Sequence, residues 1–271
     1  MHKWVKRCLI GALVAGIILE GALQVFVKIE ERKRAEAPGN SAKYDLVNLE
    51  KTEDSPLRDK TILFLGSSVT YGAAAEGQSF VELFEYQDGV DAIKEAKSAT
   101  TLADEVSPLA LLAFGNGESY VSRLKKIDTA QEIDCLVCQL STNDASLKKK
   151  LGEISESCNK EDFDTKTVTG AMEYIIAYAK EKWNCPVVFY TGSYYESSEY
   201  AAMVDRLYAL KEKWGIGVID LYTDETFNNI DSEMYKLYMF DQIHPTKAGY
   251  ELWWMPEIRK QLTEILAGQG D

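Results

Sequence analysis

The sequence predicts one α/β domain with a parallel sheet covered by helices on both faces, preceded by an apolar helix. Two observations carry this prediction. Short, almost continuously apolar runs alternate with longer amphipathic segments, which is typical of parallel strands buried on both faces. The 271 residues, 46% of them hydrophobic, suffice for one sizeable folded domain with an appendage.

The apolar helix is predicted over residues 8–27 (CLIGALVAGIILEGALQVFV), where Glu20 is the one charged residue. Twenty mostly apolar residues are long enough to cross a bilayer as a helix. A cleaved signal peptide is disfavoured because no clear small-x-small cleavage site follows the apolar core and the core is too long for a signal peptide. A buried amphipathic helix is disfavoured because a polar face is nearly absent. We therefore expect residues 1–27 to be a single-pass anchor in the cell membrane, with the folded domain outside the cytoplasm.

Charge is distributed unevenly along the chain. The net charge is −13, but residues 1–34 carry seven Lys and Arg against three Asp and Glu, which leaves −17 for the remainder. Such an acidic body repels phosphate backbones, so we expect no nucleic-acid partner. Residues 28–58 are polar, which predicts a membrane-proximal linker or stalk. Residues 59–271 are predicted to form the folded domain.

The domain alternates predicted strands and helices. Strands are expected at 61–66, 133–141, 186–193 and 216–222, with a weaker candidate at 91–97. Helices are expected at 79–86, 119–127, 166–183, 199–214 and 248–267. A parallel sheet places its functional loops at the carboxyl ends of its strands.

Cysteines give little information about the compartment. Cys135 and Cys138 fall on one predicted strand, where alternation directs them to opposite faces. We therefore expect no disulfide between them, whereas Cys158 and Cys185 could be free or paired.

Two serines stand in a glycine-framed turn, GSSVTYG, directly after the strand at 61–66. Ser67 and Ser68 have two interpretations at this point. Serine commonly caps a helix by accepting its free N–H groups, and a strand-to-helix turn can also present a nucleophilic hydroxyl to substrate. The turn lacks the lysine of a phosphate-binding loop, which argues against nucleotide hydrolysis.

A single histidine, His244, is available for chemistry in the domain, because His2 precedes the apolar helix. Asp241 lies three residues upstream in DQIHP, close enough to orient the imidazole as a base for a serine. The alternative is that Asp241 caps a turn and His244 is a surface residue. One imidazole is too few for a typical catalytic zinc site, so we expect no metal.

Three blocks together resemble the SGNH hydrolases, also called GDSL esterases and lipases. They are LFLGSSVTYG, the STND of QLSTNDAS, and DQIHPT, and the resemblance runs from Lys60 to Leu266. It implies a three-layer α/β/α, flavodoxin-like parallel sheet of five strands and hydrolysis of carboxylic esters without a cofactor. It also implies that Ser68 is the nucleophile, His244 the general base and Asp241 its orienting carboxylate.

The resemblance further implies an oxyanion hole made by the N–H groups of Ser68 and Ala99 and the Asn143 side chain. Three positions depart from the family pattern, with Ser67 in place of Asp and Ala99 and Ser141 in place of Gly. A backbone donor survives Gly→Ala where the residue does not need positive φ. Gly115 or Gly117 is the alternative to Ala99.

The substrate is open within the family, which spans lipases, thioesterases, carbohydrate O-acetyl esterases and O-acetyltransferases. Tyr194 and Tyr195 follow the strand at 186–193 and suit either sugar stacking or ordinary packing. We expect an O-acetyl group on a carbohydrate or cell-envelope glycan. The apolar run 108–114, within a segment (105–118) that is either a lid or a short packed helix, favours longer acyl chains instead. A catalytically inactive, glycan-binding module is the alternative outside enzymes.

Overall fold

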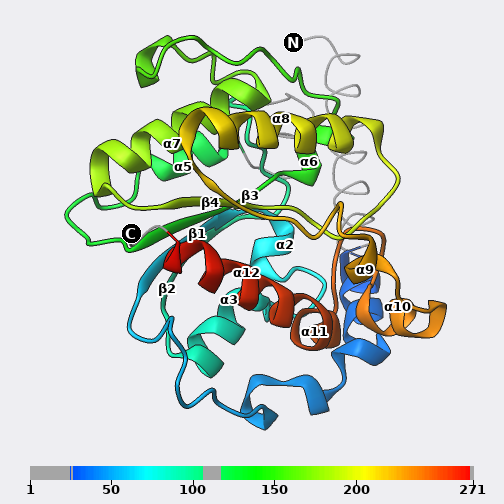
Figure 1. Ribbon diagram of the computed structural model, residues 1–271. Coiled ribbons are helices and arrows are strands. Elements are labelled where there is room, and N and C mark those ends of the chain that lie inside the picture. The colour runs from blue at the N-terminus through cyan, green and yellow to red at the C-terminus, as the bar shows by residue number, and fades with distance from the viewer. Residues whose placement is uncertain (1–24, 26, 106–116, 269–271) are drawn as a thin grey trace, which may run out of the picture.

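Five parallel strands form one sheet in the order β2-β1-β3-β4-β5 (Figure 1). The computed structural model describes residues 25, 27–105 and 117–268. The predicted five-stranded parallel sheet is confirmed. The strands are β1 (Thr61–Gly66), β2 (Asp91–Ala96), β3 (Cys135–Gln139), β4 (Val187–Tyr190) and β5 (Gly217–Ile219).

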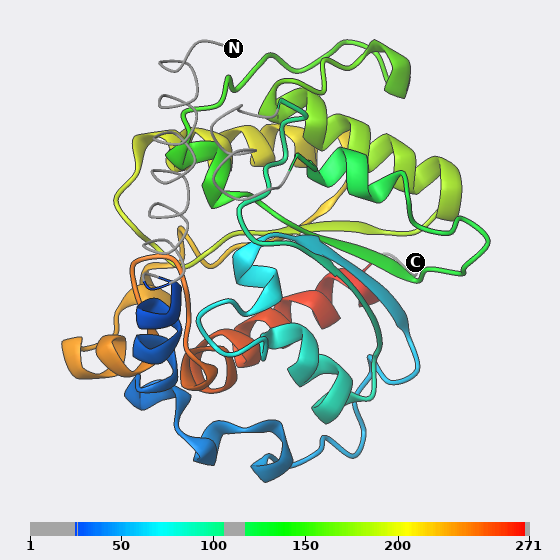
Figure 2. The ribbon, with the colours of Figure 1, turned by 180° about the vertical axis from the view of Figure 1, so that it is seen from behind.

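Each face of the sheet is covered by its own hydrophobic cluster. Leu63 and Leu65 of β1 point to one cluster and Ile62 and Phe64 to the other, as the two-residue period of a strand requires. Figures 1 and 2 show the two helical layers from opposite sides. The first layer contains α5 (Tyr120–Leu124), α6 (Thr142–Ser146), α7 (Val168–Trp183) and α8 (Ser198–Trp214), and the second contains α3 (Phe80–Leu83), α11 (Lys247–Gly249) and α12 (Met255–Ala267).

Short helices complete the connections between these layers. The helix predicted at 248–267 consists of α11, a π-helical turn (Tyr250–Trp254) and α12, and a second π-helical turn (Phe84–Asp88) extends α3. The remaining short helices are α2 (Ser68–Tyr71), α9 (Glu225–Asn228), α10 (Ser232–Tyr238) and the 3₁₀ turns Pro38–Asn40, Ala42–Tyr44, Leu46–Asn48 and Lys160–Asp162.

The difference in burial between strands explains why β2 is the weakest strand signal in the sequence. Every residue of β3 is buried, whereas β2 lies at the sheet edge and none of its residues is fully buried. The sequence of β2 correspondingly mixes polar and apolar residues.

Cys135 and Cys138 point into different clusters, which confirms their predicted opposite orientation, and both are free thiols.

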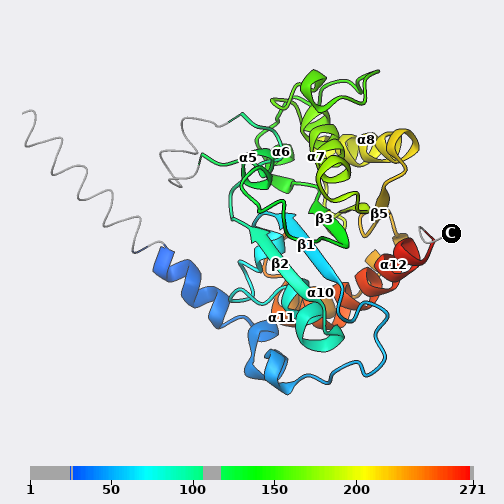
Figure 3. The ribbon, with the colours of Figure 1, turned by 90° about the vertical axis from the view of Figure 1, so that its left-hand side faces the viewer.

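Much of the segment predicted as a linker packs on the domain. Tyr44 and Leu57 are buried in the second cluster. The Asn40 side chain donates to Ala74 O at 2.6 Å and accepts from Lys247 N at 2.9 Å. The packed domain therefore begins near residue 38, before the expected boundary at 59. Figure 3 shows the helix of residues 27–35 leading away from the sheet.

Two predicted features lie mostly or wholly outside the described residues. Of the predicted apolar span 8–27, only Val25 and Val27 are described, and of the segment 105–118 only its ends are. Within 25, 27–105 and 117–268, no helix combines the length and apolarity needed to cross a membrane.

Candidate active site

The turn between β1 and α2 places Ser68 at the carboxyl end of β1. Gly66 is needed there because a Cβ would lie 1.7 Å from Thr70 Oγ1. Ser67 occupies the N-cap position of α2, but its side chain makes no capping bond. Its backbone N–H instead donates to Gln139 Oε1 at 2.8 Å. The helix-cap interpretation of the serine pair is therefore wrong.

His244 connects Ser68 to Asp241. The imidazole Nε2 lies 2.8 Å from Ser68 Oγ, and Nδ1 lies 2.8 Å from Asp241 Oδ2. Asp241 Oδ1 also accepts the backbone N–H groups of Ile243 and His244, each at 2.8 Å, which closes a tight turn. The three residues singled out in the sequence thus form a continuous hydroxyl–imidazole–carboxylate chain.

Asp241 is kept in its charged form by its hydrogen bonds. Burial works against ionisation, but donation from the His244 imidazole and the two backbone N–H groups outweighs it, and the pKa of Asp241 lies below its ordinary value. An ionised carboxylate at Nδ1 fixes the proton there and leaves Nε2 to accept the Ser68 proton. The arrangement is able to activate a serine nucleophile.

Two of the expected oxyanion donors, Ala99 and Asn143, are connected through Thr100. One hydrogen of Asn143 Nδ2 is donated to Thr100 O at 2.8 Å, so a second amide hydrogen remains. Across the described parts of the chain, no hydrogen bond uses the backbone N–H of Ser68 or Ala99. Among the described residues, these two N–H groups and the second Asn143 amide hydrogen therefore have no protein acceptor.

Ala99 does not meet the condition under which alanine replaces glycine without cost. Its φ is +62°, in the left-handed region. An L-residue with a Cβ pays roughly 1–2 kcal/mol there. The N–H at this position is thus presented by a strained backbone. Gly117, the described member of the alternative pair, is exposed.

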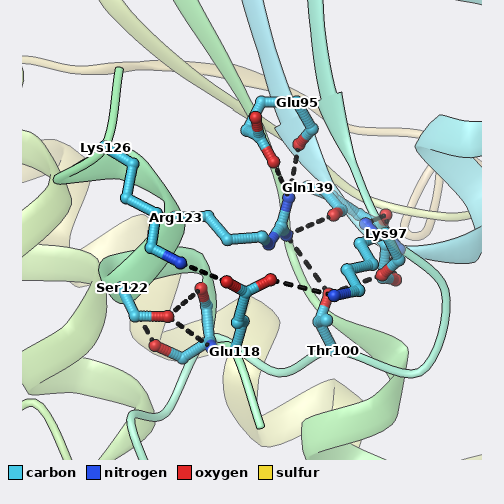
Figure 4. A network of polar contacts seen from close by, with 11 residues as sticks. Glu95, Lys97, Thr100, Glu118, Ser122, Arg123, Lys126 and Gln139 are labelled. Atoms are coloured by element: carbon cyan, nitrogen blue, oxygen red, sulfur yellow. Dashed lines mark hydrogen bonds and ion pairs between the residues drawn. The ribbon is translucent and has the colours of Figure 1, made fainter. Parts of the chain in front are cut away.

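Several polar residues that the sequence does not reveal as functional make hydrogen bonds to the segments that carry the site. Gln139 Oε1 accepts from Ser67 and from Thr70 Oγ1 at 2.9 Å. Arg123 is buried among polar partners, seen in Figure 4 with Glu95 and Thr100. A polar residue ending the apolar run IDCLVCQ was the available signal for Gln139, whereas Arg123 had none because its partners are remote in sequence.

Asp144, the residue after Asn143, is fully buried. Its Oδ2 accepts from Leu102 N at 2.7 Å and its Oδ1 from Ala103 N at 3.0 Å. Burial raises the pKa of this carboxyl to about 6, although these N–H groups and Ser141 oppose the shift. Asp144 thereby ties α6 to the loop that carries Ala99.

The two tyrosines after β4 have different environments. Tyr195 packs its ring against Tyr200 and Tyr222, at centroid distances of 5.1 and 6.1 Å, so its position is that of a packing residue. Tyr194 is 55% exposed and lies 5.3 Å from the Tyr222 ring. It borders an open pocket of about 740 Å³, whose other lining residues are Tyr222, Thr223, Glu225, Thr226, Asn228 and Asn229.

The fold was compared with known proteins. No protein-family model and no curated protein matches the sequence. One solved structure, 24% identical over 77% of this chain and 98% of its own, gives a TM-score of 0.63. A protein of Bacteroides uniformis described as a GDSL-like lipase gives 0.53, at 19% identity over 78% and 96%. A member of the lipolytic G-D-S-L family from Veillonella parvula gives 0.53, at 15% over 75% and 98%. The chain has the fold of the SGNH, or GDSL, hydrolases.

Proposed function

We propose that this protein is a serine esterase that works through an acyl-enzyme. The observation that carries the proposal is the chain from Ser68 Oγ to His244 Nε2 and from His244 Nδ1 to Asp241, with 2.8 Å at each step. A serine hydroxyl is a poor nucleophile until a base removes its proton, and this geometry supplies the base and its orienting carboxylate.

In the proposed reaction, Ser68 Oγ attacks the ester carbonyl while His244 Nε2 takes its proton. The N–H groups of Ser68 and Ala99 and the Asn143 amide stabilise the oxyanion. Collapse breaks the bond to the alcohol oxygen, which receives the proton from His244. Water, deprotonated by His244, then attacks the acyl carbon; the bond to Ser68 Oγ breaks, Oγ receives the proton from His244, and the acid leaves without any cofactor.

Hydrolysis of p-nitrophenyl acetate by the full-length chain tests this proposal. Ser68→Ala and His244→Ala should each lose at least about 10³-fold in kcat/KM. Ser67→Ala is the matched control and should retain most of the activity, because its neighbour carries the nucleophilic hydroxyl. Equal activity in wild type and Ser68→Ala would refute the mechanism.

For the substrate we propose an O-acetyl ester of a carbohydrate or cell-envelope glycan. Supporting this, the pocket beside Tyr194 combines an exposed aromatic face with hydroxyl, amide and carboxylate side chains, a mixture suited to a sugar rather than an acyl chain. Tyr194→Ala should raise KM for an acetylated oligosaccharide about fivefold or more and leave p-nitrophenyl acetate turnover unchanged. A strong preference for long-chain p-nitrophenyl esters would instead support a lipase or thioesterase.

A catalytically inactive, glycan-binding module is the second candidate, and the strained Ala99 favours it. If Ala99 fails to present its N–H, the hole loses a donor typically worth about 10²–10³ in rate. A fluorophosphonate probe separates the two candidates, since it should label wild type and not Ser68→Ala. A wild type that never labels would favour the binding module. Acetyl transfer to a sugar in place of water would use the same residues.

We also propose that residues 8–27 anchor the protein in the cell membrane, with the domain outside the cytoplasm. The support is the length and apolarity of this stretch. Carbonate-resistant membrane association that is lost when residues 1–27 are deleted is the expected result. Digestion of the domain by protease added outside an intact cytoplasmic membrane would place it outside the cytoplasm, and protection would place it inside.

A further inference from the structure

We propose that Arg123 is the positioning residue of the oxyanion hole, an inference that rests on the esterase function above. Arg123 lies on α5 with its side chain 3% exposed. A buried guanidinium carries a large desolvation cost unless its donors are satisfied. Its contacts are therefore informative about why this position holds arginine.

The guanidinium of Arg123 joins two strand ends and one loop. Nη1 donates to Glu95 O at 2.8 Å and Glu95 Oε1 at 2.9 Å. Nη2 donates to Gly66 O at 2.7 Å and to Thr100 Oγ1 at 3.2 Å. Figure 4 shows Arg123 reaching Glu95 on one side and Thr100 on the other. Its planar fork makes these bonds simultaneously, which an ammonium group could not do with the same geometry.

Two of these partners, Gly66 and Thr100, lie close in the chain to an oxyanion donor. Gly66 stands two residues before Ser68. Thr100 directly follows Ala99, and its carbonyl accepts the Asn143 amide at 2.8 Å. Through Gly66 and Thr100, the Arg123 guanidinium is thus connected to all three donors by hydrogen bonds and one or two residues of chain. Because oxyanion stabilisation depends on donors held in place before the reaction, the arrangement gives Arg123 a role in kcat without contact to substrate.

Thr100 is the junction of this arrangement. Its hydroxyl accepts from Arg123 and donates to Lys97 O at 2.6 Å, while its carbonyl serves Asn143. The ordinary alternative is that Arg123 forms a structural ion pair with Glu95. That alternative predicts an effect on stability alone, whereas the positioning role predicts an effect on turnover.

The test compares Arg123→Lys and Thr100→Val with Arg259→Lys in the full-length chain. Arg259 forms an ion pair with the buried Asp88 on the other face of the sheet, with Nε 2.9 Å from Asp88 Oδ1, although its own side chain is 26% exposed. Arg123→Lys and Thr100→Val should lower kcat for p-nitrophenyl acetate about tenfold or more, with KM changed less than about threefold. Arg259→Lys should lower Tm to a similar degree and leave kcat within about twofold.

A double-mutant cycle adds a readout that a structural role would not move. In an Asn143→Ala background, Thr100→Val should cost a clearly smaller factor in kcat than in the wild type, because one of the two donors that Thr100 holds is already gone. Full additivity, or unchanged kcat in both Arg123→Lys and Thr100→Val, would overturn the inference while an active wild type keeps the esterase function. A wild type no faster than Ser68→Ala would overturn both. If Arg123→Lys does not fold, Thr100→Val decides.

Discussion

The two halves of the site are built in different ways. Asp241 and His244 are three residues apart and share one turn, so their half is local. The half that carries the proposed oxyanion donors joins Thr100 to Asn143 across 43 positions and Leu102 to Asp144 across 42. The local half is set by a short motif, whereas the other half requires the loop, α6 and α5 to be correctly assembled. Substitutions that remove one half at a time should therefore differ in both size and kind.

The largest effect is expected in the local half. Asp241→Asn keeps the shape of the turn but removes the carboxylate that fixes the His244 tautomer. We expect kcat to fall about 10³- to 10⁴-fold with little change in KM. Steady-state kinetics with p-nitrophenyl acetate measure this, and Asp224→Asn, at the N-cap of α9, is a matched control for a surface capping aspartate. A loss below about tenfold would mean that Asp241 does not orient the base.

A smaller kinetic effect is expected in the assembled half. Asn143→Ala removes one proposed oxyanion donor and the bond to Thr100, and should lower kcat about 10²- to 10³-fold. The rate of labelling by a fluorophosphonate should fall in parallel, since the phosphonyl oxygen needs the same donors. Normal labelling combined with slow ester turnover would place Asn143 outside the hole.

Stability should respond to pH with opposite signs in the two halves. Burial raises the pKa of Asp144 from 3.8 to about 6, so between these values the folded state binds more protons than the unfolded state. Stability from this group is therefore present at low pH and falls as pH rises from about 4 to 6, by up to about 3 kcal/mol relative to Asp144→Asn. The pKa of Asp241 is lowered, so its contribution is present at higher pH and lost as pH falls below about 4.

Urea unfolding at several pH values measures both contributions. The difference in unfolding free energy between wild type and Asp144→Asn should shrink, or turn against wild type, as pH increases. The difference between wild type and Asp241→Asn should move the other way. Parallel trends for the two pairs would contradict the opposite signs.

The smallest effect concerns the strained backbone of the assembled half. Ala99→Gly removes the Cβ at φ +62° and should raise the unfolding free energy by up to about 1 kcal/mol, because strain relief exceeds the added flexibility of the unfolded chain. Ala130→Gly, an exposed alanine whose φ is not positive, should lower it by about 0.5–1 kcal/mol. Destabilisation by both changes would show that Ala99 is not strained.

The same contrast between local and assembled features separates what the sequence predicts from what it does not. Strands β1, β3, β4 and β5 are evident as apolar runs because nearly all of their residues are buried, including those of β5 at the sheet edge. Edge strand β2 was weaker because its residues are only partly covered. Residues 38–58 read as a linker because just a few of their side chains, such as Tyr44 and Leu57, enter the core.

By itself, the sequence determined the parallel sheet, the serine turn and the pairing of Asp241 with His244, because these follow from local periodicity and from residues close together in the chain. Tertiary structure alone decided the left-handed φ of Ala99, the junction at Thr100 and the buried positions of Arg123 and Asp144. The physical reason is that these groups are stabilised by partners tens of residues away. Hydrogen bonds between such distant residues produce no recognisable spacing in the sequence.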